Sequence, residues 1–431
     1  MLCLTLRGCN LLHKKVLINE NTFNTMKITR FLMVIVMLFT GRVTAEACTA
    51  AVISGKATPD GRPMIWKHRD SNYPQNAIRY FGDGKYASIG LINSADKEGE
   101  AIWAGYNSAG FAIINTASYN LLALDDTIDL KDREGILMRQ ALQQCATVEE
   151  FEEFLKKAPK PLGVEANFGV IDARGGAAWF ETDHFTFTKL DVTDPSIAPQ
   201  GYLVHTNFSF TGDPSRGAGH IRFNTAQNLF FQASQQGNLT VRWILQEASR
   251  SLWHSLTGVD LEQSDLQAGT QHFVHFTDFI PRHSSSSSVV IQGVTPGEVV
   301  ALTTMWTILG FPLTSVTFPL WLEGGQQQPS LVTTDENGVA PLCEKSLKLK
   351  ERLFPIQQNY GGNYIDVTSL VNRNGTGILQ QLKPLEDEIF ERSFRKQEAW
   401  RKNKERSCEI PAFTNELNEL ITERYLTMFG L

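Results

Sequence analysis

Cys48 has the clearest chemical potential of any residue in this 431-residue chain, because a cleavage signal ends directly before it. The signal consists of a positive segment, an unbroken apolar run and the small-x-small pattern that signal peptidase accepts: Lys27 and Arg30, residues 31–39, and Ala45-x-Ala47. Cleavage after Ala47 would make Cys48 the first residue. Its α-amine would titrate near ~8, so it would be partly neutral at working pH and able to accept the thiol proton. One residue would then supply both the nucleophile and its base.

Two other uses of Cys48 are open. Bacterial lipoproteins are lipidated at a cysteine that follows their signal, which would make this chain a membrane-tethered binding protein. That pattern wants Leu three residues before the cysteine, whereas this chain has Ala45 there and Glu46 next. Alternatively, Cys48 is the nucleophile of a cysteine protease with a separate base, His68 or His205, and need not be terminal.

Charge and hydropathy limit the partners and the location. Met26 opens the signal, so residues 1–25 are left out of fold reasoning, and residues 1–47 are expected to be removed. Removal takes six basic and two acidic residues from a chain of net charge −6 and leaves a net charge of −10. Nucleic acid and anionic membranes require a basic surface, so neither is expected as a partner. No second apolar run approaches the ~18 residues of a membrane span. We expect an exported protein, periplasmic or secreted.

The cysteine content indicates what stabilises the mature chain. Four cysteines remain after processing: Cys48, Cys145, Cys343 and Cys408. So few in an exported chain of this size indicate that the hydrophobic core carries stability, and not a disulfide framework. Cys145 is predicted to be packed at a helix junction. Cys343 and Cys408 are predicted to be bonded to each other, which would contribute ~2–4 kcal/mol.

A β-hairpin is predicted to position Cys48. Residues 49–54 are apolar and β-prone, residues 58–61 read Thr-Pro-Asp-Gly and form a turn, and residues 63–66 return as a strand. A hairpin brings the end of its second strand back beside the start of its first. The ionisable run Lys67-His68-Arg69-Asp70 is therefore expected beside Cys48.

These features resemble the N-terminal cysteine amide hydrolases, a group that includes choloylglycine hydrolases, acid ceramidase-like amidases, penicillin acyltransferase-like enzymes and secreted cysteine dipeptidases. The resemblance begins with Cys48-Thr49 at a processed terminus, a turn with Asp60-Gly61, and a basic residue three before Asp70. Three more motifs follow in the order of that group: a strand-turn-strand segment at residues 104–115 that ends in Asn115, the pair Thr206-Asn207, and Arg222. The resemblance covers about residues 48–325.

The resemblance assigns roles around Cys48. Asp70 would orient the α-amine, and Lys67 with Arg222 would favour the thiolate. Several relatives carry arginine where this chain has Lys67. Arg69 could supply the charge instead, but on a strand Arg69 points to the face opposite Asp70, which favours Lys67.

The resemblance also implies the reaction. The side-chain amides of Asn115 and Asn207 would donate to the oxyanion of a tetrahedral intermediate. Cys48 would form a thioester with the acyl part of a small-molecule linear amide, and water would hydrolyse it. Acyl transfer and dipeptide cleavage are variants of the same chemistry. The resemblance implies no cofactor and no metal, and it leaves open the acyl group, the amine and the oligomeric state.

The implied fold is α+β, a four-layer αββα sandwich over residues 48–330, followed by a mostly helical C-terminal extension over residues 331–431. Apolar residues with period 3.6 predict two helices within residues 129–157, and a capping box at Thr147 starts the second.

Five later segments give further expectations. Residues 284–288 are all serine and are expected to form an exposed entrance to a strand, and residues 289–302 to form two strands around Gly293. The aromatic run 306–321 either lines a pocket or belongs to the core. The spacing His272-x-x-His275-x-x-Asp278 suggests a metal, but on a strand the two histidines would face opposite sides. A solvated helix face is expected from Glu386, Glu388, Glu391, Arg392, Arg395 and Lys396.

Overall fold

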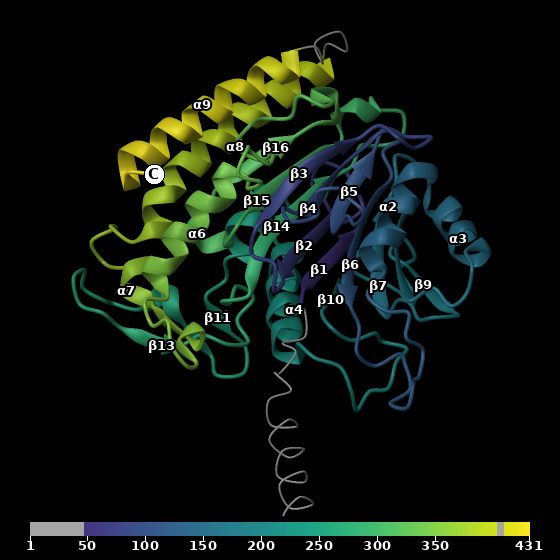
Figure 1. The fold of residues 1–431 in the computed structure, drawn as a ribbon, viewed down its shortest axis with the longest axis horizontal. Helices are drawn as coiled ribbons and strands as arrows, with labels where there is room; N and C mark the ends of the chain where they lie inside the picture. Colours follow the sequence, from purple (N-terminus) through teal and green to yellow (C-terminus); the bar gives the residue numbers. More distant parts are fainter. Residues whose placement is uncertain (1–46, 403–408) are drawn as a thin grey trace, which may run out of the picture. The chain divides into compact units, whose positions relative to one another are not determined.

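Two β-sheets packed face to face form the centre of the structure, a computed structural model that describes residues 47–402 and 409–431 (Figure 1). The described residues belong to one compact unit. The expected leader, apart from Ala47, lies outside the described residues, and so does Cys408. Within the described ranges, no helix is both long enough and apolar enough to span a membrane.

In the described part of the chain, the first sheet has six antiparallel strands in the order β10-β1-β2-β14-β15-β16. Their bounds are Tyr202–His205 (β10), Thr49–Ile53 (β1), Met64–Asp70 (β2), Ser285–Gln292 (β14), Thr304–Leu309 (β15) and Thr317–Leu320 (β16). Cys48 directly precedes β1, which lies between β10 and β2. The candidate nucleophile is therefore at the end of an interior strand.

The second sheet of the described residues has seven antiparallel strands in chain order, β3 to β9. Their bounds are Asn76–Phe81 (β3), Ser88–Asn93 (β4), Ala104–Asn107 (β5), Ala112–Ala117 (β6), Ala166–Ile171 (β7), Ala177–Thr182 (β8) and Phe187–Asp191 (β9). The sheets are in close contact at Gly169 of β7, where a Cβ would lie 2.7 Å from the side chain of Val52 in β1. A larger residue at position 169 would force the sheets apart.

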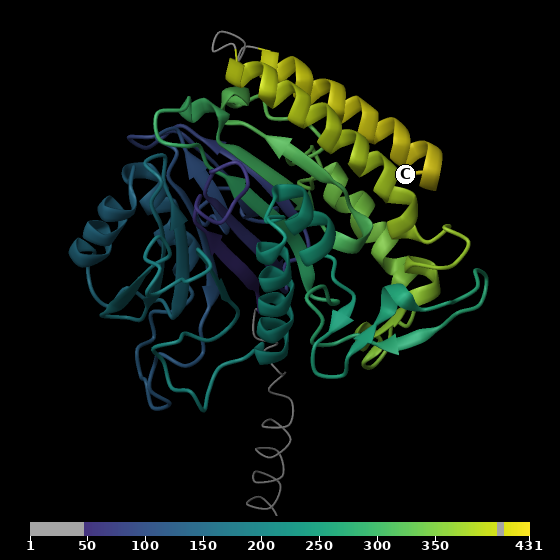
Figure 2. The same cartoon turned by 180° about the vertical axis from the view of Figure 1, so that it is seen from behind.

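Helices cover the outer face of each sheet, so that four layers result (Figures 1 and 2). On the second sheet, Phe151 packs its ring on Phe168 and Phe180. It belongs to α3 (Val148–Lys157), which follows α2 (Glu134–Gln144). On the first sheet, Phe230 of α4 (His220–Gln235) stacks on Trp66 with ring centroids 5.6 Å apart, and α8 (Ile378–Lys402) covers β15. The predicted αββα class is confirmed.

The remaining elements are short or lie near the C-terminus. They are α5 (Val241–Trp243), α6 (Pro341–Leu353), α7 (Val367–Leu370), α9 (Ile410–Phe429), and the two-strand pairs β11 (Trp253–His254) with β12 (Val259–Asp260) and β13 (Phe273–His275) with β17 (Tyr364–Asp366). The predicted cap of α3 is present, since Thr147 Oγ1 accepts from the Glu150 N–H.

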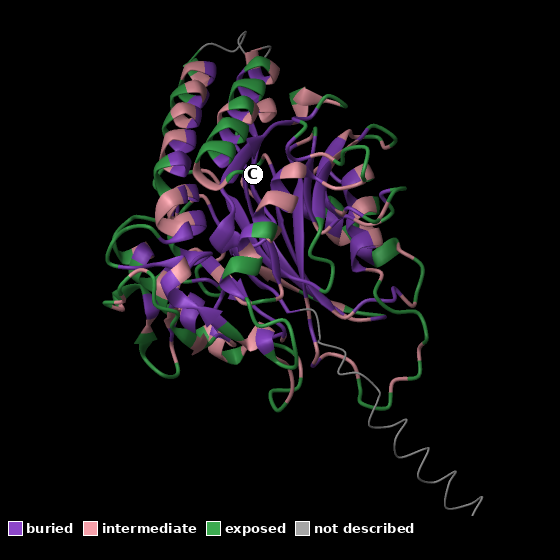
Figure 3. Ribbon diagram, turned by 60° about the vertical axis from the view of Figure 1, so that its left-hand side comes forward, coloured by how far each residue is buried: buried purple, intermediate pink, exposed green. Residues whose placement is uncertain are grey.

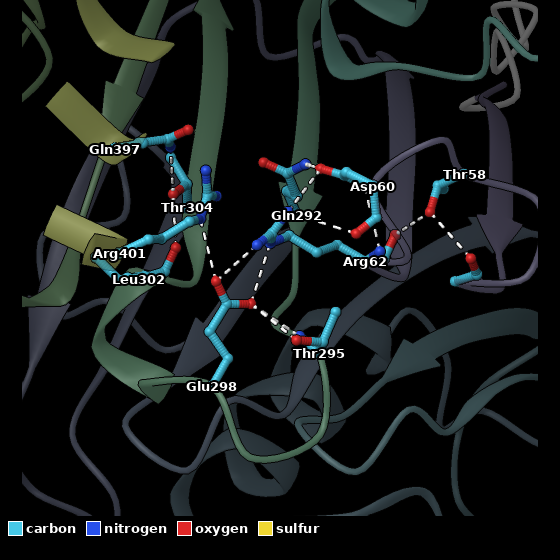
Figure 4. Close-up of polar contacts among 11 residues, drawn as sticks. Thr58, Asp60, Arg62, Gln292, Thr295, Glu298, Leu302, Thr304, Gln397 and Arg401 are labelled. Carbon is cyan, nitrogen blue, oxygen red and sulfur yellow. Dashed lines mark hydrogen bonds and ion pairs between the residues drawn. The ribbon is translucent and has the colours of Figure 1, made fainter. Parts of the chain in front are cut away.

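The predicted hairpin is confirmed, with β1 and β2 antiparallel and Thr49 opposite His68. Its turn, at the end remote from Cys48, is fixed by charge (Figure 4). Arg62 donates twice to Glu298, at 3.0 and 2.7 Å, and Glu298 also accepts from Arg401 of α8 at 3.1 Å. This cluster joins the turn to the loop between β14 and β15 and to the end of α8.

Alternation along the hairpin divides its side chains between two cores. Ala50, Val52 and Ile65 join the core that contains the interface of the two sheets, whereas Ala51 and Ile53 join the core beneath α4. Both cores exclude water, as the burial colouring of the central strands shows (Figure 3). Because successive side chains alternate, the side chain of Cys48 follows Ala50 and points toward the second sheet.

Some expectations for the later segments are wrong. The serines of β14 are buried, at 1 % exposure or less from Ser285 to Ser288, because β14 is an interior strand between β2 and β15. The strand that returns from β14 begins at Thr304 and not around Gly293, since the chain first makes a loop and a short 3₁₀ turn. The aromatic run 306–321 is buried throughout and belongs to the core.

Glu386 was expected on a solvated face, but it is buried and carries the main polar contact of α8. Arg250 donates to both of its carboxylate oxygens, at 2.5 and 2.7 Å, and the Thr317 N–H of β16 donates at 2.8 Å. Arg250 also donates to the carbonyl oxygens of Pro312 and Ser315. A bidentate pair inside this ring of backbone groups fixes α8 to the first sheet.

Cys343 in α6 is a buried free cysteine in the described part of the chain, with its Sγ 3.4 Å from the Pro74 carbonyl oxygen. This does not agree with the predicted bond to Cys408, which lies outside the described residues. Cys145 is packed as predicted, and burial raises the pKa of its thiol to about 12.

We predict that Arg250→Met will lower the free energy of unfolding by about 3–5 kcal/mol, because it leaves the Glu386 carboxylate buried without a cation. Chemical denaturation will measure the loss. Arg242→Met is the matched control, since Arg242 pairs with Asp387 on the same helix but is partly exposed, and it should cost less than about 1 kcal/mol. Equal losses for the two variants would contradict this account of how α8 is held.

Candidate active site

Cys48 lies between two segments that carry predicted site residues. It is 5 % exposed. Continuing the antiparallel register of β1 with β10 and with β2 puts Cys48 level with Asn207 on one side and with Arg69 on the other. Each neighbour is on the same face as the Cys48 side chain, because directly opposed residues share a face. The two sheets and their register thus assemble a site from residues that are far apart in the sequence.

Arg222 of α4 joins the start of β1 to Asn207. Its Nη1 donates to the Cys48 carbonyl oxygen at 2.7 Å and to Thr49 Oγ1 at 2.8 Å, and its Nη2 donates to Asn207 Oδ1 at 2.9 Å. Gly219, directly before α4, has φ +82°, and a Cβ there would lie 2.3 Å from Arg222 Nη2. Glycine is needed at this position for the backbone and for the guanidinium to fit.

Arg222 keeps its positive charge although its side chain is buried and bonds to neutral groups. The side chain is 1 % exposed, and its hydrogen-bond partners within the described residues are the three neutral oxygens just named. Burial and, after it, the Arg282 charge lower the pKa of its guanidinium to about 10, although the Asp70 carboxylate opposes both. Arg222 therefore stays charged at neutral pH. A buried cation bonded only to neutral oxygens is costly, which is typical of a functional site.

Lys67 fixes the orientation of Asn115. Its Nζ donates to Asn115 Oδ1 and, at 2.9 Å, to the Trp103 carbonyl oxygen. An ammonium group can only donate, so the amide oxygen of Asn115 must face Lys67 and its Nδ2 must point elsewhere. Asn207 is fixed in the same way, with Oδ1 facing Arg222. Both predicted oxyanion donors are thus held at their oxygen atoms by cations.

Lys67 and Arg69 share one face of β2. Their charged groups lie over the Trp103 ring, 5.7 and 4.8 Å from its centroid, and Arg69 Nη1 donates to Asn76 Oδ1 at 2.7 Å. Asp70 is on the opposite face from both, so the alternation argument for preferring Lys67 does not separate them. Their contacts do, because Lys67 reaches a predicted oxyanion donor.

Asp70 is joined to the peptide before Cys48 through Arg282. Arg282 Nε donates to Asp70 Oδ2 at 2.9 Å, and Nη2 forms an ion pair with the same oxygen at 2.9 Å. Nη2 donates to the Ala47 carbonyl oxygen at 3.3 Å. This carbonyl belongs to the bond that signal cleavage would break. Sequence reasoning missed Arg282, which is 212 residues from Asp70. Its one signal was its place just before the serine run 284–288, and only the pairing of β14 with β2 shows that this run lies beside Asp70.

The second oxygen of Asp70 accepts from Ser285 Oγ at 2.6 Å. The hydroxyl proton of Ser285 therefore points at Asp70, and Ser285 Oγ accepts from His68 Nε2 at 2.9 Å. Burial lowers the pKa of His68 to about 4, and the nearby Asp70 carboxylate opposes the shift. His68 is neutral at pH 7, carries its proton on Nε2, and lies on the opposite face of β2 from Lys67.

His205, the other candidate base, is also engaged. Its Nε2 lies 2.9 Å from Glu181 Oε1, and its ring packs between the rings of Trp179 and Phe210, at centroid distances of 4.5 and 4.3 Å. Neither His68 nor His205 directs its Nε2 to the Cys48 thiol. The Nε2 atoms of both rings are thus engaged by groups other than the thiol.

One cavity of the described residues lies away from Cys48. A cavity of about 560 Å³ is lined by Ser54, Gly61 and Gly175 at the other end of β1, ~20 Å from Cys48 by strand rise. In residues 47–402 and 409–431, no group of three His, Cys, Asp or Glu side chains could hold a metal ion. All six predicted site residues lie around the start of β1.

Residues 59–256 match the model of a family described as acyl-coenzyme A:6-aminopenicillanic acid acyl-transferase. The match includes five of the predicted site residues and begins after Cys48. No curated protein matches the chain.

Three similar solved structures share between 12 % and 17 % sequence identity with this chain. The N-acylethanolamine-hydrolyzing acid amidase ortholog of Caenorhabditis elegans is 17 % identical over 45 % of this chain and 86 % of its own, with a TM-score of 0.32. A mutant of the conjugated bile acid hydrolase of Clostridium perfringens is 12 % identical over 64 % and 92 %, with a TM-score of 0.39. Penicillin V acylase of Agrobacterium tumefaciens is 15 % identical over 64 % and 86 %, with a TM-score of 0.35.

The neutral state of His68 predicts an acid-sensitive stability. The unfolded chain binds this proton below pH ~6.5, whereas the folded protein binds it only near pH 4. Stability should therefore fall as the pH is lowered from about 6.5 to about 4, by about 3 kcal/mol from this group. In His68→Gln, the amide can still donate to Ser285 without titrating, so the slope of unfolding free energy against pH should be shallower. An unchanged slope would mean that His68 is protonated or hydrated in the folded protein.

Proposed function

We propose that this chain is an exported enzyme whose mature form begins at Cys48 and cleaves linear amides of small molecules through a thioester. The match of residues 59–256 to the acyl-transferase family model supports the proposal. The observation that carries the proposal is the paired arrangement of cations and asparagines beside Cys48. Lys67 holds the amide oxygen of Asn115 and Arg222 holds that of Asn207, so each Nδ2 is turned away from its cation, and Asn207 Nδ2 donates one N–H to the Ala117 carbonyl oxygen. Oriented N–H donors next to a nucleophile are what acyl chemistry requires.

The first half of the reaction forms the thioester. The α-amine of Cys48 takes the thiol proton, and the sulfur attacks the amide carbonyl carbon. The carbonyl oxygen becomes an oxyanion that accepts N–H groups from Asn115 and Asn207. The C–N bond then breaks, the protonated α-amine gives its proton to the departing nitrogen, and the amine product leaves.

The second half releases the acyl group. Water loses a proton to the α-amine and attacks the thioester, the C–S bond breaks, and Cys48 recovers its proton. The same intermediate attacked by an amine gives acyl transfer instead, and a dipeptide substrate would make the enzyme a dipeptidase. Asp70 and Arg282 lie at the peptide that becomes the amine, so they would hold it in place, while Lys67 and Arg222 favour the thiolate.

The requirement for a free α-amine can be tested by adding one alanine before Cys48 that cannot be removed. The fold should be retained, because the added residue keeps the carbonyl that accepts from Arg282. The α-amine becomes an amide nitrogen with no basic lone pair, so release of amine from a panel of amide substrates should collapse. N-terminal mass analysis of the exported protein checks the start, and it would also reveal a lipidated cysteine.

Two variants serve as controls for the extended chain. Cys48→Ser with a free terminus keeps the base and supplies a poorer nucleophile, so it should retain reduced activity, and Cys48→Ala should be inactive. Hydrolysis by the alanine-extended protein at the mature rate would show that the amine is not the base. A histidine-assisted cysteine would then be the better account.

Asn115→Ala and Asn207→Ala should each lower kcat by about 10²-fold and leave KM nearly unchanged, because these donors act mainly on the transition state. Asn107→Ala is the matched control. Asn107 is a buried asparagine of β5 whose Nδ2 donates to two helix carbonyls remote from the site, so its loss should affect stability and not kcat. A change confined to KM would mean that the asparagine only binds substrate.

A further inference from the structure

The two predicted oxyanion donors are each followed by a loop, and the two loops are bound to one another. The first loop, residues 118–122, follows β6 and Asn115. The second loop, residues 208–216, follows Asn207 and leads to α4. The strands before them belong to different sheets. The distance between the two donors therefore depends on what joins these loops.

Asn120 is the central link between the loops. Its Oδ1 accepts from the Ser209 N–H at 2.8 Å, and its Nδ2 donates to the carbonyl oxygens of Ser209 at 2.9 Å and Asp213 at 3.2 Å. Its own carbonyl oxygen accepts from the Asp213 N–H at 2.8 Å. Asn120 is buried, and a Cβ on Gly212 would lie 2.5 Å from its Nδ2. The side-chain amide of Asn120 thus forms hydrogen bonds with the backbone of the second loop, as a peptide group of a neighbouring strand does in a sheet.

Polar groups surround this link without involving Asn115 or Asn207. Ser118 Oγ lies 2.9 Å from both Asn120 Oδ1 and Ser209 Oγ, and Ser209 Oγ donates to Asn167 Oδ1 at 2.6 Å. Arg216 of the second loop donates to the carbonyl oxygen of Leu122 at 2.6 Å. Buried polar networks that are satisfied in this way hold one geometry, because any displacement leaves several groups unpaired at once.

A direct contact connects the loops to the donor itself. Asn207 Nδ2 donates to the Ala117 carbonyl oxygen at 3.0 Å, directly before the first loop. Movement of one loop relative to the other would change this contact and would turn the amide of Asn207. The geometry needed for catalysis is sensitive on this scale, since a displacement of ~1 Å costs about 10²-fold in rate.

We propose that Asn120 is a positioning residue for amide hydrolysis, which sets the separation and orientation of Asn115 and Asn207 by holding the two loops together. The inference rests on the proposed function, because it assigns Asn115 and Asn207 to the oxyanion. Asn120 does not contact Cys48 and acts only through the loops.

The test compares Asn120→Ala with Asn372→Ala in the mature full-length enzyme. Asn372 is a second buried asparagine, in the loop between α7 and α8, and its side chain accepts from Asn374 and Thr376 and donates to the Thr368 carbonyl oxygen. Both variants should lose similar thermal stability, because each removes a satisfied buried amide. Asn120→Ala should lower kcat ~10-fold or more with KM within about 3-fold, whereas Asn372→Ala should leave both unchanged.

A double-mutant cycle with Asn207→Ala separates positioning from general damage. If Asn120 acts by placing Asn207, its substitution should lower kcat much less in the Asn207→Ala background than in the wild type. Fully additive effects would overturn the proposal, and so would a normal kcat in Asn120→Ala. Either result would leave the proposed function standing if Asn207→Ala alone remains impaired, whereas a silent Asn207→Ala would overturn the proposed role of that donor.

Ser118→Ala serves if Asn120→Ala does not fold. It removes only the hydroxyl that contacts Asn120 and Ser209, so the backbone contacts between the loops remain. It should lower kcat a few-fold with KM unchanged, and in the Asn207→Ala background it should have little effect. A wild-type kcat in this variant would contradict the proposal.

Discussion

The candidate site depends on two buried cations that donate to neutral acceptors. Lys67 and Arg222 are each 1 % exposed, and each donates to the oxygen of an asparagine side chain and to a backbone carbonyl oxygen. Taking such charges out of water is unfavourable by several kcal/mol unless the site compensates. For Arg222, a carboxylate partner would compensate more fully, but it would also cancel the positive field. Its neutral acceptors keep that field, and the two cations fix the two amides in one orientation.

The fold supplies what these cations require. β1 is an interior strand, so its start is lined on both sides by chain, and the second sheet covers the face that the Cys48 side chain occupies. α4 begins near the same point, and Arg222 in its first turn reaches Cys48 and Asn207 because Gly219 has no side chain in the way. The αββα layers thus exclude water from a point where segments from both sheets converge. The turn cluster around Glu298 and the pair of Arg250 with Glu386 are remote from this point and hold α8 and the hairpin in register.

Local patterns were sufficient to predict part of this arrangement. The hairpin after Cys48, the segment that ends in Asn115 and the helix cap at Thr147 depend on turn chemistry and on periodicity, which a short stretch of sequence contains. Arg282 and the burial of Glu386 depend on which distant strands pair, and no local pattern carries that information. The serines of β14 show the same limit. A polar run normally indicates exposure, but both faces of this interior strand are covered, and hydroxyls such as those of Ser285 and Ser288 form hydrogen bonds with buried groups.

The distribution of charge explains how a base and a nucleophile on one residue can operate together. A protonated amine is disfavoured by nearby positive charge, as is a neutral thiol, so the field of Lys67 and Arg222 moves both groups toward their reactive forms. Asp70 alone would work against this by favouring the protonated amine. Its ion-pair partner Arg282 neutralises it, so the pair adds little net charge and lies where the α-amine would form once Ala47 is removed. The positive field at the thiol therefore comes from Lys67 of β2 and Arg222 of α4. The orientation comes from Asp70, on the opposite face of β2 from Lys67, with its partner Arg282.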